Sequence, residues 1–222
     1  MMPKIIPSIV TTNLVMNLDA SNPSSYSGSG VNWFDISGNS NNGTLINGPT
    51  FNTDNGGNIV FDGTDDYVST SLLATKLEFT IFMWVKLNQT LNNDVLCVDD
   101  GSGYLYLGFA DSTNKIYMGA FDSSSKNTKS TNVINTNQIY NFVGTYKGSD
   151  FVKLYINGIL DSQSATTLAA TGIGATVSPL KFFKNASSYS NGTIYQILLY
   201  SRALTASEIL QNFNATRNKF GL

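Results

Sequence analysis

Histidine is absent from this 222-residue chain, and glutamate occurs only at Glu78 and Glu208. Without histidine there is no Ser-His-Asp or Cys-His catalytic machinery and no histidine-based metal site. Adjacent residues of a strand point to opposite faces, so neither aspartate pair forms the facing carboxylates of a glycosidase: Asp65/Asp66 and Asp99/Asp100. The sequence therefore predicts a non-enzymatic protein. The alternative is a glycosidase whose catalytic aspartates are distant in the sequence and are brought together by folding.

The single cysteine, Cys97, excludes an intramolecular disulfide, so the cysteine count does not indicate an oxidising compartment. Only 13% of the residues are charged, the net charge is −2, and no lysine/arginine cluster is present. Nucleic-acid binding needs a basic face that displaces counterions. We therefore expect no nucleic-acid partner.

Long apolar runs are also missing, because nothing approaches the roughly 18 apolar residues of a membrane helix. Residues 1–13 carry only Lys4 as a basic residue, and Pro7 and Ser8 interrupt the apolar stretch, so this is a poor secretory signal. We expect no membrane insertion. Residues 1–13 are interpreted as an N-terminal arm, either a frayed terminus or a docking strand that pairs with a partner, and 14–222 as one domain.

Alternation of apolar and polar residues is what the chain has in abundance. Residues 138–164 contain two alternating runs, a turn cluster, and Asn157-Gly158 between apolar neighbours. A period of two is typical of strands, and both turn residues tolerate the positive φ of a type I′ hairpin. This stretch predicts three antiparallel strands.

The remaining pattern extends this all-β prediction to an antiparallel two-sheet sandwich. Residues 77–87 are partly apolar on both faces, which indicates a central strand, and residues 123–130 are expected to form a polar loop. Thr205 and Glu208 form a capping box for a short C-terminal helix. Further strands are expected over 14–19, 44–46, 59–61, 67–69, 95–98, 104–109, 115–121, 132–134, 180–183 and 193–200.

Several segments resemble laminin-G-like, concanavalin A-like jelly-roll domains. The central one is VGTYKGSDFVKLYINGIL, and the others are WFDISGNSNNGTL, IVFDGTDDYV, FTIFMWVKL and GTIYQILLYSRALTASEI. The segments follow the family's order over about residues 14–214. The resemblance implies a jelly-roll sandwich, but this fold hosts lectins, glycosidases, adhesion modules and virion proteins, so it does not select one function.

Many proteins of this fold bind Ca²⁺ at loops on one edge, and two acidic loops offer the oxygen ligands that calcium prefers. The candidate ligands are Asp62, Asp65, Asp66, Asp99 and Asp100. The alternative is that these side chains stabilise turns through hydrogen bonds to their own backbone. Some calcium-binding relatives carry acidic residues after the glycine that matches Gly192, whereas this chain has Tyr195 and Gln196.

Glycan binding by this fold uses exposed aromatic rings, and the chain has 11 tyrosines. The candidate platforms lie near loop-rich segments: Tyr104, Tyr106, Tyr117 and Tyr189. Strand aromatics also fill cores, which is the alternative for each of them.

Residues 14–51 resemble the start of laminin-G-like domains in tailed-phage proteins. The resemblance implies a virion decoration, head-fibre or tail-associated protein that associates with itself or other virion proteins and binds surface glycans weakly. The alternative is a bacterial extracellular carbohydrate-binding or adhesion module. The start at Met1-Met2 and the end just after Phe220 lead us to expect a whole gene product, which favours the virion hypothesis.

Overall fold

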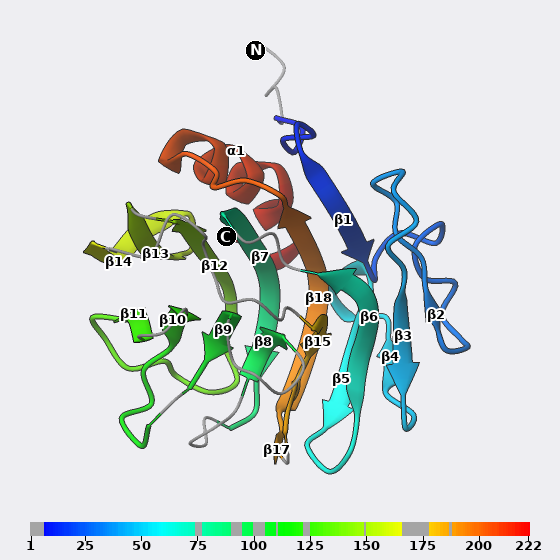
Figure 1. Cartoon of the computed structure of the whole chain (residues 1–222). Helices are drawn as coiled ribbons and strands as arrows, with labels where there is room; N and C mark the ends of the chain where they lie inside the picture. Colours follow the sequence, from blue (N-terminus) through cyan, green and yellow to red (C-terminus); the bar gives the residue numbers. More distant parts are fainter. Residues whose placement is uncertain are drawn as a thin grey trace.

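The computed structural model contains two antiparallel β-sheets stacked face to face, with one helix on the outside (Figure 1). It describes residues 7–73, 77–89, 95–99, 105–109, 111–121, 125–148, 150–165, 178–186 and 188–222. The all-β sandwich with a short C-terminal helix that the sequence predicted is confirmed.

Sheet A has the strand order β14-β13-β12-β7-β18-β5-β4, and β1 pairs with the second half of β18. Its strands are β1 (Leu14–Asp19), β4 (Thr50–Asn52), β5 (Asn58–Asp62), β7 (Glu78–Leu87), β12 (Ile139–Lys147), β13 (Phe151–Ile156), β14 (Ile159–Ala165) and β18 (Asn191–Tyr200). The three strands predicted within 138–164 are β12, β13 and β14 at one edge.

Sheet B has the order β11-β10-β9-β8-β15-β6-β3-β2. Its strands are β2 (Asn32–Trp33), β3 (Gly43–Ile46), β6 (Tyr67–Leu73), β8 (Val95–Asp99), β9 (Leu105–Gly108), β10 (Tyr117–Phe121), β11 (Ser125–Lys129) and β15 (Pro179–Phe182). A separate small hairpin is formed by β16 (Lys184–Asn185) and β17 (Ser188–Tyr189).

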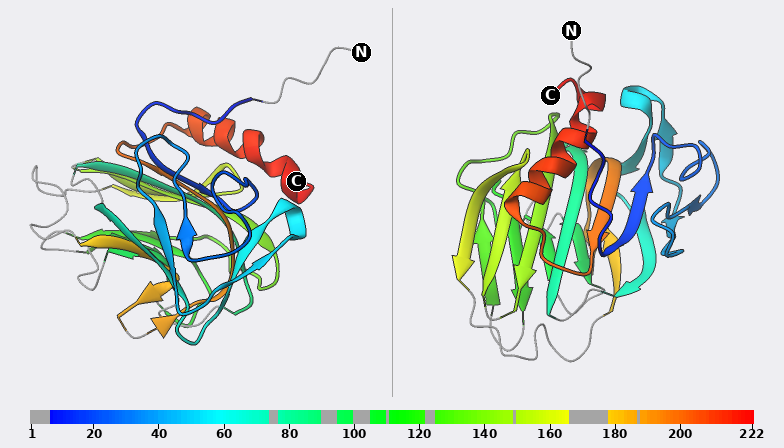
Figure 2. Two further views of the ribbon diagram at one scale, coloured as in Figure 1. Left: turned by 90° about the vertical axis from the view of Figure 1, so that its right-hand side faces the viewer. Right: turned by 90° about the horizontal axis from the view of Figure 1, so that it is seen from above.

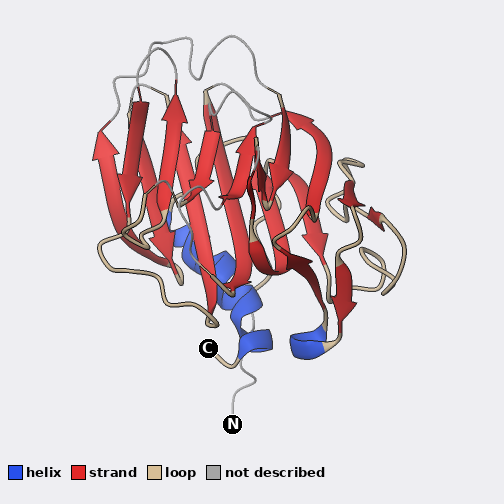
Figure 3. Ribbon diagram, turned by 90° about the horizontal axis from the view of Figure 1, so that it is seen from below, coloured by secondary structure: helices blue, strands red, loops and turns tan. Residues whose placement is uncertain are grey.

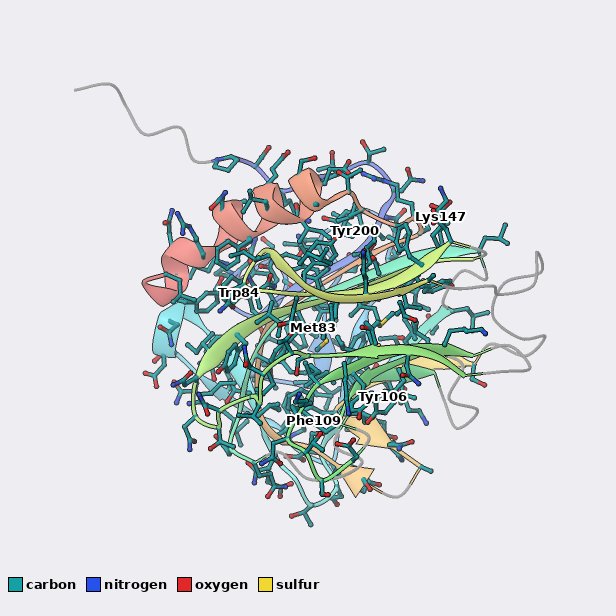
Figure 4. All side chains as sticks on the ribbon, turned by 90° about the vertical axis from the view of Figure 1, so that its left-hand side faces the viewer. Met83, Trp84, Tyr106, Phe109, Lys147 and Tyr200 are labelled. Carbon is teal, nitrogen blue, oxygen red and sulfur yellow. The ribbon has the colours of Figure 1, made fainter. Side chains whose placement is uncertain are left out.

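The central strand β7 serves two hydrophobic clusters, as its two apolar faces predicted. Phe79, Ile81 and Met83 point between the sheets into the main core. Phe82 and Trp84 point the other way and join a second cluster beneath the helix. Figure 4 shows Met83 between the two layers and Trp84 with Tyr200 on the helix side.

Helix α1 (Ala206–Thr216) lies across the outer face of sheet A (Figure 2). The predicted capping box is present: Thr205 accepts a hydrogen bond from the N–H of Glu208, whose carboxylate accepts from the N–H of Thr205. A 3₁₀ helix, η2 (Arg217–Phe220), follows and lies beside η1 (Asp54–Gly56) at the end of α1 (Figure 3).

Residues 7–13 of the expected N-terminal arm lie against α1 and β18. The N–H of Val10 donates to Oδ1 of Asn212 at 2.8 Å, and the Tyr200 hydroxyl donates to the Val10 carbonyl at 2.9 Å. Val10 is buried in the cluster beneath the helix. This part of the segment is thus docked on its own domain.

The expected type I′ turn joins β13 to β14, with φ values of 51° at Asn157 and 78° at Gly158. Two local predictions are wrong. Residues 125–129 of the expected loop form edge strand β11, because a strand that pairs on one side tolerates polar residues on both faces. Residues 132–134 are not a strand; Ile134 is a buried anchor whose N–H donates to the Asn114 carbonyl.

No helix of the described residues is long and apolar enough to cross a membrane.

Candidate functional site

Three of the predicted calcium ligands meet in the loop between β5 and β6. The carboxylate oxygens of Asp62, Asp65 and Asp66 lie within 4.8 Å of one another. Asp62 and Asp65 are exposed, whereas Asp66 is only 5% exposed. Gly63, at φ +79°, permits the tight turn that brings them together. We call Asp62, Asp65 and Asp66 the acidic loop.

Hydrogen bonds within the acidic loop explain its shape. Asp62 Oδ1 accepts from the Thr64 N–H at 2.7 Å, and Asp66 Oδ2 accepts from the Asp62 N–H at 3.2 Å. Burial raises the pKa of the Asp66 carboxyl, and the charges of Asp62 and Asp65 add to the increase. A divalent cation with oxygen ligands would offset this repulsion. The arrangement therefore suits both a turn and a Ca²⁺ site.

The second acidic loop is only partly within the described residues. Asp99 is the last residue of β8 and pairs with Leu180, and its side chain lies outside the described part of the chain. Asp100 lies wholly outside it.

Two of the predicted aromatic residues share the outer face of sheet B. Tyr106 of β9 pairs with Gly119 of β10, and Tyr117 of β10 pairs with Gly108 of β9. The two tyrosines are therefore diagonal neighbours on one face. Their strand neighbours Leu105, Leu107 and Met118 point into the core, so both rings point outward. Figure 4 shows Tyr106 on the side of sheet B away from Met83.

Both rings are held by hydrogen bonds of their hydroxyl groups. The Tyr106 hydroxyl donates to the Phe109 carbonyl at 2.5 Å, and the Tyr117 hydroxyl donates to Oδ2 of Asp111. Lys129 Nζ lies 5.5 Å from the Tyr117 ring centroid and 3.9 Å from Asp111 Oδ2. Hydrogen bonds from Thr113 and Tyr117 lower the Asp111 pKa to about 2, so its carboxylate is ionised at neutral pH. We call Tyr106 and Tyr117, with Gly108 and Gly119 opposite them, the tyrosine face.

The other two candidate tyrosines do not join this face. Tyr189 lies on the β16–β17 hairpin, where its ring is 6.2 Å from that of Tyr67. Lys184 Nζ lies 4.4 Å from the Tyr67 centroid and 5.3 Å from that of Tyr189. Tyr67 is in β6, three strands from β9 in sheet B, or roughly 14 Å at the usual strand spacing. Tyr104 lies outside the described residues.

A polar groove on the outer face of sheet A was missed by the sequence analysis. It has a volume of about 340 Å³, and asparagine side chains provide much of its lining: Asn52, Asn55, Asn58, Asn88 and Asn137. Five strands (β4, β5, β7, β12 and β18) and the β4–β5 connection contribute to it, so only folding brings these residues together. The one sequence feature that marks it is the asparagine density of residues 52–58.

Comparisons with known proteins agree with this architecture. The family model of the concanavalin A-like lectin/glucanases superfamily, of the third laminin-G type, matches residues 62–210. The chain therefore belongs to this family. A search of curated protein sequences finds no match.

Three solved structures illustrate the fold similarity. The binding domain of Paraclostridial Mosquitocidal Protein 1 has a TM-score of 0.74 and 19% identity, over 94% of this chain and 53% of that one. Domain 4 of AbnA, a GH43 extracellular arabinanase from Geobacillus stearothermophilus, in complex with arabinotriose, gives 0.71 and 17%, over 90% and 98%. Trypanosoma rangeli sialidase in complex with sialic acid gives 0.69 and 18%, over 98% and 36%.

At these identities the similarity shows the fold alone. The chain spans about half the length of the mosquitocidal binding domain and about a third of the sialidase.

Proposed function

We propose that this protein is a non-catalytic carbohydrate-binding module whose tyrosine face contacts the glycan. The observation that carries the proposal is the pairing of two outward, hydroxyl-anchored tyrosines with two glycines on adjacent strands. Because glycine has no side chain, neither Gly108 nor Gly119 adds a side chain that would compete with a sugar for the rings.

Anchoring matters because it lowers the cost of binding. A ring already fixed by its own hydroxyl loses little rotamer entropy when a ligand stacks on it. Asp111 and Lys129 beside Tyr117 supply a charged acceptor and a donor for sugar hydroxyls. Family membership and the arabinotriose complex of AbnA domain 4 support a sugar as the ligand class.

Calcium would act at the acidic loop as a structural ion. Three carboxylates within 4.8 Å provide hard oxygen ligands, and two of them are exposed to an arriving cation. In this structural role, calcium is not required for contact between the tyrosine face and a sugar.

For the biological setting we propose a tailed-phage virion, in which the module decorates the capsid or tail, contacts virion neighbours and gives weak adhesion to surface glycans. The sequence resemblance of residues 14–51 supports this setting. A bacterial extracellular adhesion module is the alternative. Finding the chain by mass spectrometry in gradient-purified virions would support the first, and finding it only in bacterial secretions would support the second.

The binding proposal is tested by comparing the wild type with the double variant Tyr106→Ala/Tyr117→Ala on a broad glycan panel that includes arabinotriose. We expect the wild type to bind one glycan class and the double variant to lose about tenfold or more in affinity, roughly 1.4 kcal/mol. Tyr189→Ala is the matched control and should bind like the wild type. Equal binding by the double variant, or no binding by the wild type, would refute the proposal.

A further inference from the structure

The floor of the polar groove is one row of side chains that crosses four adjacent strands. Val60 of β5 pairs with Thr193 of β18, Thr193 pairs with Lys86 of β7, and Lys86 pairs with Ile139 of β12. All four residues line the groove. The row lies beyond the end of α1, where Tyr195 packs edge-on against Phe220 of η2 with ring centroids 5.1 Å apart.

The walls supply hydrogen-bonding groups from opposite sides of this floor. Asn52 Oδ1 accepts from the Asp54 N–H at 2.7 Å, so its amide N–H groups stay available. Asn88 Nδ2 donates to Oδ1 of Asn191 at 2.7 Å, which leaves the Asn88 carbonyl oxygen to accept. The groove therefore offers both donors and acceptors, as a polyhydroxylated ligand requires.

The side-chain ammonium group of Lys86 has no hydrogen-bond or ion-pair partner in the part of the chain that the structure describes. Its side chain is half-buried between Thr193 and Ile139, and Asp54 of the wall lies beyond ion-pair distance. The N–H donors of the ammonium group are thus available to an anion within the groove. A ligand that removed water from Lys86 without providing an acceptor would lose affinity.

We propose that this groove binds a saccharide unit that carries a carboxylate, of the uronic-acid or sialic-acid type. The carboxylate pairs with Lys86, the sugar hydroxyls bond the amide groups of Asn52 and Asn88, and the apolar ring face lies on Val60 and Ile139. The residues that line the groove include one cation, Lys86, and one carboxylate, Asp54, which favours a singly charged ligand over a phosphate. The site is separate from the tyrosine face, and this inference does not depend on it.

The test is calorimetric titration with an oligogalacturonate of defined length, its methyl ester, and N-acetylneuraminic acid. We expect at least one acid to bind, and the ester to bind at least about tenfold more weakly, because it is neutral. Lys86→Gln should lose about tenfold in affinity for the acid, and Lys86→Arg should retain most of it. Lys153→Gln, another lysine of sheet A, is the matched control and should be unchanged.

Equal binding of acid and ester, unchanged binding by Lys86→Gln, or no binding of either acid would overturn the proposal. The double variant Tyr106→Ala/Tyr117→Ala separates the two sites, since it should retain acid binding. Loss of acid binding in that variant, with Lys86→Gln unaffected, would transfer the acidic ligand to the tyrosine face and refute the groove site.

Discussion

The indole Nε1 of Trp84 donates a hydrogen bond of 2.8 Å to Oγ1 of Thr216, a residue 132 positions later in the chain. Trp84 is fully buried at the centre of sheet A, and Thr216 ends α1. The Trp84 ring also stacks on Phe213, with centroids 5.5 Å apart. This bond ties the C-terminal helix to the central strand and so fixes where the helix ends and the polar groove begins.

Thr216→Val should destabilise the fold, because it leaves the buried indole N–H without an acceptor. We expect a loss of about 1–3 kcal/mol in the free energy of unfolding, measured by urea denaturation. Thr216→Ser keeps the hydroxyl and should lose less than Thr216→Val. A larger loss in Thr216→Ser than in Thr216→Val would show that the methyl group, and not the hydrogen bond, matters.

Gly158→Ala should be costly for two separable reasons. Its φ is +78°, and an added Cβ would lie 2.8 Å from Cγ of Phe213 on the helix. Gly30→Ala is the matched control, since its φ is +88° with no atom within 4 Å of the new Cβ. Positive φ alone costs about 1–2 kcal/mol, and overpacking adds about 1–3 kcal/mol.

Chemical denaturation of both glycine variants measures the difference. Equal losses at Gly158 and Gly30 would mean that the helix moves aside without cost.

Period-two alternation was enough to predict most strands and the type I′ turn, because a half-buried strand must alternate and Asn157-Gly158 suits positive φ. The capping box could also be predicted, because its two residues are only three positions apart in the sequence. Edge strand β11 was missed because SKNTK has no apolar face. Segment 132–134 was mistaken for a strand because Ile134 is buried as a single anchor and not as part of a ladder.

The candidate sites were predictable only where they are local. Asp62, Asp65 and Asp66 are neighbours in the sequence, and their loop could be proposed directly. That Tyr106 and Tyr117 share a face depends on the pairing of β9 with β10, which composition does not specify. The polar groove could not be predicted from the sequence, because Lys86, Val60 and Ile139 lie in one row only through the order of the strands in sheet A.

Acid should weaken the fold through Glu208. Its carboxylate forms a two-point pair with Arg202, at 2.7 and 2.9 Å, which lowers its pKa from 4.5 to about 2. A lowered folded-state pKa stabilises the protein above pH 4.5, and that stabilisation is lost as the pH falls towards 2.

Glu208→Gln should therefore lower the free energy of unfolding at pH 7 by about 1 kcal/mol, from the lost ion pair and cap. The difference from the wild type should shrink between pH 4.5 and pH 2 in denaturation at a series of pH values. A difference that stays constant down to pH 2 would contradict this assignment.

Calcium binding at the acidic loop predicts a rise in the thermal midpoint on adding millimolar Ca²⁺ to EDTA-treated protein. Asp65→Asn removes one exposed ligand and should reduce that rise, whereas Asp150→Asn, an exposed aspartate outside the loop, should not. Midpoints that are the same in Ca²⁺ and in EDTA would exclude a calcium site. Repeating the glycan panel in both conditions shows whether sugar binding depends on the ion.

The most direct test of the central claim is an NMR titration that follows the tyrosine ring protons while the best-binding glycan of the panel is added. If the tyrosine face is the glycan site, the ring resonances of Tyr106 and Tyr117 shift together and saturate with one dissociation constant, while those of Tyr189 stay fixed. Saturation at Tyr189 with no change at Tyr106 and Tyr117 would contradict the account.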